Sequence, residues 1–199
     1  MRQKALLAVV ALVAVLLIGA PTAFATNLLT NGSFQNGDFS GWNTSCGLCL
    51  VESGPFYVYP GAQDGDGFYV IMGDVASDGT FSQTFSDTAG AHYTFSFWFA
   101  SVGDNPSDFS AYWDGGTPLL SLTNPNTGVN WSEYSFSVTG TGIDTISFNE
   151  RDDPAYMALD NVSVSPSGGT TPEPSSLLLL GSGLLTVGGV IRKKLQANR

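Results

Sequence analysis

Two cysteines have the spacing that comes nearest to a reactive motif in this sequence. Cys46-Gly47-Leu48-Cys49 matches the C-x-x-C spacing of dithiol redox motifs. No histidine follows Cys49, which argues against haem attachment, and the surrounding residues favour strands over the strand–helix junction of oxidoreductases. We therefore expect a short-loop disulfide between Cys46 and Cys49 that stiffens the chain after Trp42, with free redox thiols as the alternative.

The other residue types used in catalysis lack the partners that catalysis requires. His92 is the only histidine, and no G-x-S-x-G motif occurs, so neither a multi-histidine metal site nor a Ser-His-Asp triad is indicated. Glu52, Glu133 and Glu150 are the glutamates of the central segment, and each is predicted to lie on the surface. We therefore expect no enzyme, and a secreted carbohydrate-active enzyme with a carboxylate pair is the alternative.

Aromatic side chains are the candidates for ligand binding. Sugar rings stack on exposed aromatic faces, while neighbouring polar groups fix their orientation. The alternative for each aromatic residue is packing in the core or beneath a loop. The candidates for binding are Tyr57, Tyr59, Trp98 and Trp113.

The segment that must position these residues reads as one β-rich domain, residues 26–164. Gly, Ser, Thr, Asn and aromatic residues are abundant there, which favours strands and turns over helices. Tyr93, Phe95, Phe97 and Phe99 alternate with other residues and are predicted to face the core. Short strands separated by turns predict an antiparallel β-sandwich. The predicted strands cover 27–34, 56–59, 67–72, 80–85, 93–99, 109–113, 131–138, 143–148 and 156–164.

The last predicted strand changes the side that its apolar residues face. Met157 and Leu159 fall on one face, whereas Val162 and Val164 fall on the other. This change predicts a β-bulge at Asp160-Asn161, and a bulge can redirect a side chain. Residues 165–171, rich in Ser, Gly and Thr, are predicted to be a flexible linker.

The central segment is strongly acidic. Residues 26–171 contain sixteen acidic residues and one basic residue, Arg151, which gives a net charge of −15. Such a surface repels nucleic acids and anionic membranes, so nucleic acid is excluded as a partner.

The N-terminus has the three parts of a secretory signal peptide, residues 1–25. Arg2 and Lys4 are positive, an apolar helical stretch follows, and Ala23-Phe24-Ala25 is an A-x-A cleavage site. We expect export by a secretion translocon and cleavage by signal peptidase after Ala25. An uncleaved membrane anchor is the alternative.

The C-terminus also has three parts, residues 172–199. Pro172-Glu173-Pro174 is extended because proline restricts the backbone, residues 177–191 are apolar, and Arg192-Lys193-Lys194 form a basic stop. As a single transmembrane helix the apolar run spans about 22 Å, a little less than a hydrocarbon core of about 30 Å. The basic stop places the C-terminus in the cytoplasm. A permanent tail anchor or a buried helix is the alternative.

This tail resembles the PEP-CTERM protein-sorting signal, although Thr171 stands where the family often has an aliphatic residue. The resemblance implies that an exosortase-type membrane peptidase cleaves near Pro172-Glu173-Pro174. Glu173 would then be recognised by another enzyme and do no chemistry itself. The protein would be held transiently in the inner membrane by its C-terminal helix and would then reach the cell surface or the extracellular space.

The domain also resembles galactose-binding-like β-sandwich modules, a class of carbohydrate-binding module. The resemblance rests on Asn31-Gly32-Ser33-Phe34, Gly41-Trp42, the pair 82–85 and 93–98, and Ala158-Leu159-Asp160-Asn161-Val162. It implies a jelly-roll fold and binding of polysaccharide. It further implies a structural Ca²⁺ held by Gln35, Asp66 and Asp160, the first of which replaces an expected acidic residue. The alternative is that Asp160 caps backbone amides at the bulge.

The sequence thus predicts an exported cell-surface or extracellular-matrix protein. It is predicted to be a jelly-roll β-sandwich between an N-terminal signal helix and a C-terminal transmembrane helix. The expected role is non-catalytic binding of polysaccharide. A self-associating structural surface protein is a further alternative, because the predicted sheet edges carry few charges.

Overall fold

The computed structural model describes residues 26–167, apart from Tyr57, Pro60, Asp64, Asp66 and Pro154. This part of the chain contains ten strands and no helix, and hence no helix able to span a membrane. The predicted signal peptide with Ala23 and Ala25 lies outside the described residues. So do the predicted transmembrane helix and the C-terminal residues Pro172, Glu173, Pro174, Arg192, Lys193 and Lys194.

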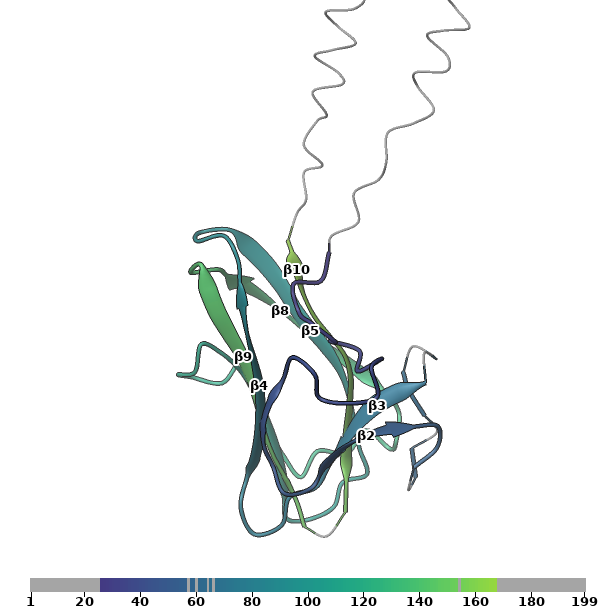
Figure 1. Cartoon of the computed structure of the whole chain (residues 1–199). Coiled ribbons are helices and arrows are strands. Elements are labelled where there is room, and N and C mark those ends of the chain that lie inside the picture. Colours follow the sequence, from purple (N-terminus) through teal and green to yellow (C-terminus); the bar gives the residue numbers. More distant parts are fainter. Residues whose placement is uncertain are drawn as a thin grey trace, which may run out of the picture. The chain divides into compact units, whose positions relative to one another are not determined.

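The strands form two five-stranded antiparallel sheets that face each other, which confirms the predicted all-β, two-sheet architecture (Figure 1). Sheet A has the order β1-β4-β9-β6-β7, and sheet B has the order β2-β3-β10-β5-β8. In sheet A the bounds are β1 Asn43–Ser45, β4 Gly79–Ser86, β9 Ile143–Asp152, β6 Ser107–Trp113 and β7 Leu120–Thr123. In sheet B they are β2 Cys49–Ser53, β3 Phe68–Met72, β10 Met157–Pro166, β5 His92–Ser101 and β8 Ser132–Thr139.

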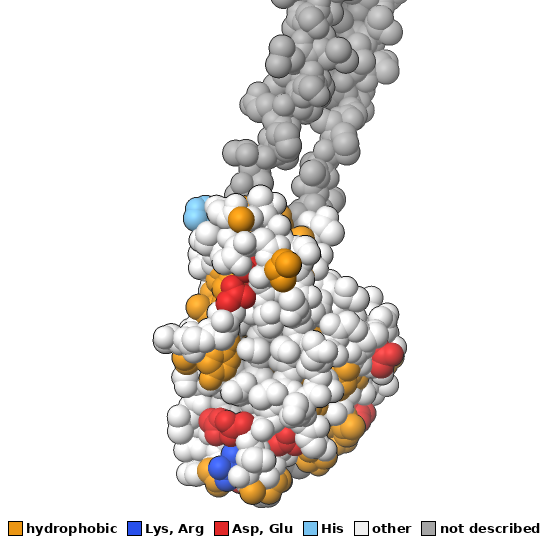
Figure 2. Space-filling model, turned by 60° about the vertical axis from the view of Figure 1, so that its left-hand side comes forward, with side chains coloured by type: hydrophobic (Ala, Val, Ile, Leu, Met, Phe, Trp, Pro, Cys, Tyr) orange, Lys and Arg blue, Asp and Glu red, His pale blue; other side chains and the backbone are white. Residues whose placement is uncertain are grey.

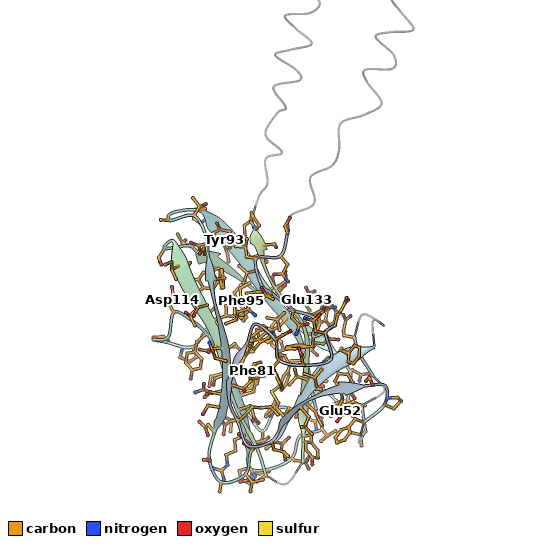
Figure 3. All side chains as sticks on the ribbon, in the orientation of Figure 1. Glu52, Phe81, Tyr93, Phe95, Asp114 and Glu133 are labelled. Atoms are coloured by element: carbon orange, nitrogen blue, oxygen red, sulfur yellow. A yellow bond between two sulfur atoms is a disulfide. The ribbon has the colours of Figure 1, made fainter. Side chains whose placement is uncertain are left out.

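Aromatic rings fill the space between the sheets. The predicted inward face of β5 is confirmed, because Phe95, Phe97 and Phe99 are fully buried. Phe148 of β9 meets them from sheet A, with its ring centroid 5.1 Å from that of Phe97. Figure 3 shows Phe81 and Phe95 within this layer. The Phe-rich alternation in β4, β5 and β9 therefore sets which sides of the two sheets remain outside.

The prediction of a strand over residues 27–34 is wrong. This segment lies beside the second half of β10 and makes two backbone bonds to it, from Leu28 N to Val164 O at 2.8 Å and from Val162 N to Gly32 O at 2.9 Å. Between these bonds the side chain of Asn27 accepts from Val164 N and donates to Val162 O. Asn31 and Phe34 also take positive φ angles of 53° and 57°, which turn the chain out of an extended path.

Other strand boundaries differ in detail. Residues 56–59 form a tight turn closed by an isolated bridge between Phe56 and Tyr59. The short strands β1, β2 and β7 were not predicted, because each is only three to five residues long and shows too little of an alternating pattern. Ser165 and Pro166 pair with β5, so β10 takes up the first two residues of the predicted linker. The predicted bulge is confirmed by the register shift between Asp160 and Ser163.

Candidate functional site

Trp98 lies on the outer face of sheet B. Its neighbours in β5, Phe97 and Phe99, point into the core, so the Trp98 side chain projects to the other side and is half-buried there. Across the sheet Trp98 is paired with Asp160 of β10 on one side and with Glu133 of β8 on the other. The indole therefore stands between two carboxyl-bearing residues, of which Glu133 is exposed and Asp160 is buried.

The next row of the same face carries only hydroxyl groups. Ser96 is paired with Ser163 of β10 and with Ser135 of β8, and both serines beside it point outward because their chain neighbours face the core. We refer to Trp98, Glu133, Asp160, Ser96 and Ser163 as the Trp98 face.

A loop, residues 54–67, lies over the outer face of sheet B beside Trp98. Tyr59 of this loop packs against Tyr69, Ile71 and Ala158 in a second, smaller apolar cluster. The indole Nε1 of Trp131 donates to Gly61 O at 3.3 Å and holds the loop down. The loop therefore forms a wall along one side of the Trp98 face.

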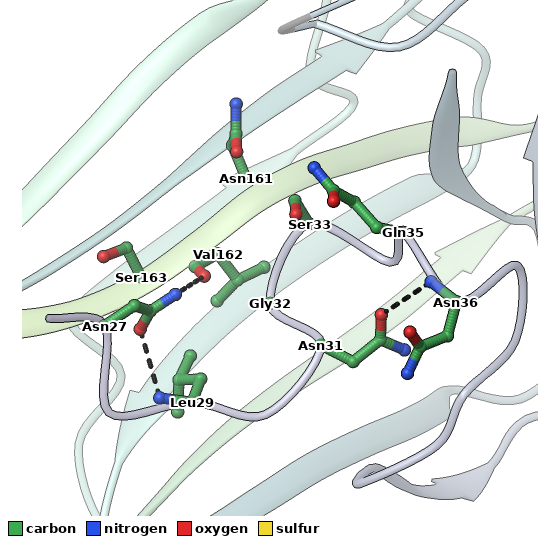
Figure 4. A pocket seen from close by; sticks show the side chains of 10 residues that line it. All are labelled: Asn27, Leu29, Asn31, Gly32, Ser33, Gln35, Asn36, Asn161, Val162 and Ser163. Carbon is green, nitrogen blue, oxygen red and sulfur yellow. Dashed lines mark hydrogen bonds between the residues drawn. The ribbon is translucent and has the colours of Figure 1, made fainter. Parts of the chain in front are cut away.

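A polar pocket of about 430 Å³ continues from Ser163 and Asn161 toward the N-terminal segment. Figure 4 shows the side chains of Ser33, Gln35 and Asn161 around it. Asn31 shapes the pocket, since its amide donates to Asp38 O and its carbonyl accepts from Asn36 N. The complete lining is Asn27, Leu29, Asn31, Gly32, Ser33, Gln35, Asn36, Asn161, Val162 and Ser163.

The pocket can offer a ligand amide and hydroxyl groups but no carboxylate. Its volume falls within the range of about 300 to 1,000 Å³ that is usual for small-molecule sites. Asn161 bridges the pocket and the wall, because its Nδ2 donates to Gln63 Oε1 at 2.9 Å. Asn161 also has a φ of 51°, which follows from the bulge. The bulge thus directs an amide toward the pocket.

The predicted calcium ligands are only partly brought together. Asp160 is buried, and its carboxylate accepts bonds from Gln63 N at 2.7 Å and from Asn161 N at 2.6 Å. Gln35 lines the pocket, and Asp66 lies outside the described residues. Within the described part of the chain, no three or more His, Cys, Asp or Glu side chains gather to hold a metal.

Two of the predicted sugar-binding aromatics are in the wrong place for that role. Tyr59 is 1% exposed, because it fills the small cluster beneath its own loop. Trp113 points between the sheets and packs edge-on against Phe85 with a centroid distance of 5.6 Å. Tyr57 lies outside the described residues. Of the four candidates, Trp98 alone is described on an outer face.

The outer face of sheet A is a second polar surface. Tyr112 of β6 is its half-buried aromatic residue, since Ala111 and Trp113 on either side of it face inward. Figure 2 brings forward the side of Figure 1 where β4 and β9 lie, and its middle is largely white, the colour of uncharged polar side chains and backbone. One row crosses all five strands through Ser45, Thr80, Asn149, Ser110 and Ser121.

The prediction that Glu150 lies on the surface is wrong. Glu150 points inward from β9 and is fully buried, because Phe148 and Asp152 share its side of the strand. Burial raises the pKa of Glu150 to about 8, and the nearby carboxylates of Asp74, Asp152 and Asp108 add to this effect. The alternation of inward and outward side chains along β9 could have indicated that Glu150 faces inward, but the predicted strand ended at residue 148.

The Cys46–Cys49 disulfide closes the loop between β1 and β2. Asp74 holds the same loop, since its carboxylate accepts bonds from Gly47 N at 2.9 Å and Leu48 N at 2.6 Å. Glu150 Oε1 lies 3.7 Å from Cys49 Sγ. These contacts fix the loop between β1 and β2 against the start of β4 and the end of β3.

Replacing both cysteines by serine is expected to lower the free energy of unfolding by about 2 kcal/mol, because the closed loop is only a few residues long. Urea denaturation of the oxidised protein and the double variant measures this difference. The oxidised protein with added reductant should match the variant. A loss above about 4 kcal/mol would show that the disulfide does more than restrict the unfolded chain.

Sequence reasoning missed the residues that make the pocket. Ser33, Asn36, Asn161 and Ser163 carry no local pattern of their own, and segments 31–36 and 161–163 are far apart in the chain. The change of face at Asp160-Asn161 was the available signal. It predicts the bulge, but it does not indicate that residues 31–36 lie beside the bulge in the folded protein.

Comparisons with known proteins support the predicted C-terminal sorting motif and the predicted fold of the domain. Residues 170–193 match the PEP-CTERM protein-sorting motif. No curated protein matches the sequence. The fold is similar to a CBM61 module, TmCBM61, solved in complex with β-1,4-galactotriose, with a TM-score of 0.55 and 19% identity over 72% of this chain and 100% of that chain. The predicted likeness to carbohydrate-binding-module sandwiches is confirmed for the fold.

Proteins of other roles share this sandwich. The K1 cleaved adhesin domain of Lys-gingipain from Porphyromonas gingivalis W83 has a TM-score of 0.52 and 15% identity, covering 68% of this chain and 96% of that chain. The enzymatically active domain of bacteriophage CBA120 tailspike protein 4 has a TM-score of 0.53 and 19% identity, covering 71% of this chain and 21% of that chain. At such identities the likeness shows the fold and no activity.

Proposed function

We propose that the protein is an exported surface or matrix component whose jelly-roll β-sandwich binds polysaccharide without turning it over. The carrying observation is Trp98, a half-buried indole on an outer sheet face, flanked by Asp160 and Glu133 and followed by a row of serines. A flat aromatic surface with fixed polar neighbours is the arrangement that sugar rings stack on. The CBM61 module of similar fold was solved with β-1,4-galactotriose, a neutral sugar, which supports this class of ligand.

The delivery of the domain follows from its termini. The sorting motif at residues 170–193 supports recognition by an exosortase-type peptidase near Pro172-Glu173-Pro174. The predicted signal peptide supplies the earlier export step. The C-terminal apolar run would hold the protein in the inner membrane until it is processed, and the domain would then act at the cell surface or outside the cell.

The charge of the domain limits the class of polysaccharide that it can bind. Arg151 is the one Lys or Arg between residues 26 and 171, against sixteen acidic residues. An anionic polysaccharide would be repelled by this surface. Neutral hexose or pentose polymers fit both the charge and the hydroxyl-rich rows beside Trp98.

Replacing Trp98 by alanine is expected to weaken binding of the full chain to a neutral polysaccharide at least tenfold, because stacking on the indole is lost. Affinity electrophoresis against a panel of neutral and acidic polysaccharides measures this change in affinity. Tyr112→Ala is the matched control, since Tyr112 is the half-buried aromatic residue on the outer face of sheet A, and it should bind as the wild type does.

Three results would contradict the proposal. Loss of binding in Tyr112→Ala with none in Trp98→Ala would move the site to sheet A. Hydrolysis of a bound polysaccharide that is abolished by Glu133→Gln would make the protein an enzyme. Failure of every neutral polysaccharide to bind would remove the function itself.

A further inference from the structure

Asp152 is a buried carboxylate without a donor. It ends β9 with its side chain between the sheets and is 0% exposed. Both of its carboxylate oxygens are buried and have no hydrogen-bond partner among the described residues. Burial, with a smaller effect of the charges of Asp104 and Asp153, raises the pKa of Asp152 to about 7. A buried charge that lacks hydrogen bonds is strongly destabilising, so such a group calls for a compensating partner.

Asp104 lies near Asp152, and one of its carboxylate oxygens also lacks a hydrogen-bond partner among the described residues. It belongs to the turn between β5 and β6, is half-buried, and has its Oδ2 atom buried without a partner among the described residues. The turn is folded against the end of β9. Ser107, which pairs with Asp152, donates its hydroxyl to Asp104 O at 2.6 Å, and Asp153 N donates to Pro106 O at 3.0 Å.

The described part of the chain supplies no positive side chain to this place. Arg151 is the basic residue nearest in sequence, but it lies on the opposite side of β9 and is paired with Asp153. His92 begins β5, whereas Asp104 follows its end. The negative charge must therefore be balanced either by protons or by a bound cation.

We propose that Asp152 and Asp104 form a binding site for a hard divalent cation, Ca²⁺ in an extracellular setting. Asp152 would offer both carboxylate oxygens and Asp104 its Oδ2 atom. Ca²⁺ takes six to eight oxygen ligands, and water reaching the half-buried side of Asp104 completes the set. Carboxylate oxygens without donors are the groups that such an ion satisfies.

This site differs from the calcium site that the galactose-binding-like resemblance implies. That site depends on Asp160, which lies on the outer face of sheet B and accepts bonds from Gln63 and Asn161. Asp152 lies in sheet A and faces the interior. The ion proposed here would tie the β5–β6 turn to the end of β9, and the proposal does not depend on glycan binding.

The test measures the melting temperature of the detergent-solubilised full chain in EGTA and in excess CaCl₂, with MgCl₂ as a second ion. Calcium at about 100 times its Kd is expected to raise the melting temperature by about 5 to 10 °C. Asp152→Asn should abolish most of this shift, and in EGTA it should melt at or above the wild type because the buried charge is gone. Isothermal titration with CaCl₂ should give one binding event fewer in the variant.

Asp160→Asn is the matched control, and it should keep the Asp152-dependent shift. Asp104→Asn, at a half-buried position, provides a second test if Asp152→Asn does not fold, and it should weaken calcium binding at least tenfold. The proposal is overturned if calcium leaves the wild-type melting temperature unchanged. It is also overturned if Asp104→Asn or Asp152→Asn responds as fully as the wild type, or if Asp160→Asn alone removes the response.

Discussion

The protein is expected to lose stability as the pH rises from about 5 to about 9 in calcium-free buffer. Glu150 is fully buried, and its pKa of about 8 lies well above that of the unfolded chain, near 4.5. The folded state therefore keeps a proton that the unfolded state releases, and this contribution is complete below about pH 4.5 and disappears as the pH passes 8. The expected loss of unfolding free energy is about 2 to 5 kcal/mol.

Urea denaturation at pH 5, 7 and 9 in EGTA measures this dependence. Glu150→Gln should remove the larger part of the pH dependence, and its amide keeps an acceptor for Asp74 N, which donates to Glu150 Oε2 at 3.3 Å. A smaller loss remains in this variant, because the pKa of buried Asp152 is also raised, to about 7. Glu133→Gln is the matched control, since Glu133 is exposed, and it should leave the profile as it is. A stability that rises between pH 5 and 9 would show that Glu150 is ionised in the folded protein.

Replacing Phe148 by alanine is expected to lower the free energy of unfolding by about 3 to 5 kcal/mol, the usual loss for a buried phenylalanine. Phe148 is 0% exposed, and its ring stacks on Phe81 with a centroid distance of 4.9 Å. It also packs against Phe97 and Phe109 at 5.1 and 5.7 Å. One truncation therefore removes contacts to both sheets.

Urea unfolding at pH 6 with calcium present, followed by fluorescence, measures the loss. Phe136→Ala is the comparison, because Phe136 is half-buried on the edge strand β8, and it should lose less than half as much. Phe148→Leu should fall between the two. An equal loss in Phe148→Ala and Phe136→Ala would mean that the layer between the sheets is not the main source of stability.

Much of the sandwich could be predicted because one face of each long strand is buried. β5 carries an aromatic residue at every second position from Tyr93 to Phe99, and that period identifies a half-buried strand. Phe81 and Phe85 mark the inward side of β4 in the same way, although Gln83 stands between them. The bulge in β10 could be predicted for the same reason, since it interrupts the period. The strand prediction for residues 27–34 failed because the chain turns at Asn31 and Phe34, whose φ angles are positive, and a pattern of apolar residues does not report such turns.

The candidate site was predictable to a smaller extent. Trp98 could be assigned to an outer face, because Phe97 and Phe99 fix the direction of its strand. Tyr59 and Trp113 could not be assigned to an inner or outer face in this way. Tyr59 lies in a turn and Trp113 at the end of a strand, where side chains do not alternate regularly between the two faces. The pocket beside Asn161 depends on a contact between segments more than a hundred residues apart.

The sequence by itself determined that this is an acidic β-sandwich with a sorting motif at its end. Charge, alternation of apolar residues and a local linear motif are all read along the chain, and none needs a distant contact. Only the tertiary structure decided that Trp98 stands between Asp160 and Glu133 and that Glu150 is buried. It also decided that Asp152 is buried with no hydrogen-bond partner for its carboxylate among the described residues. These facts depend on which strands lie side by side and which loops cover them, and burial of a polar group is decided by its neighbours in space.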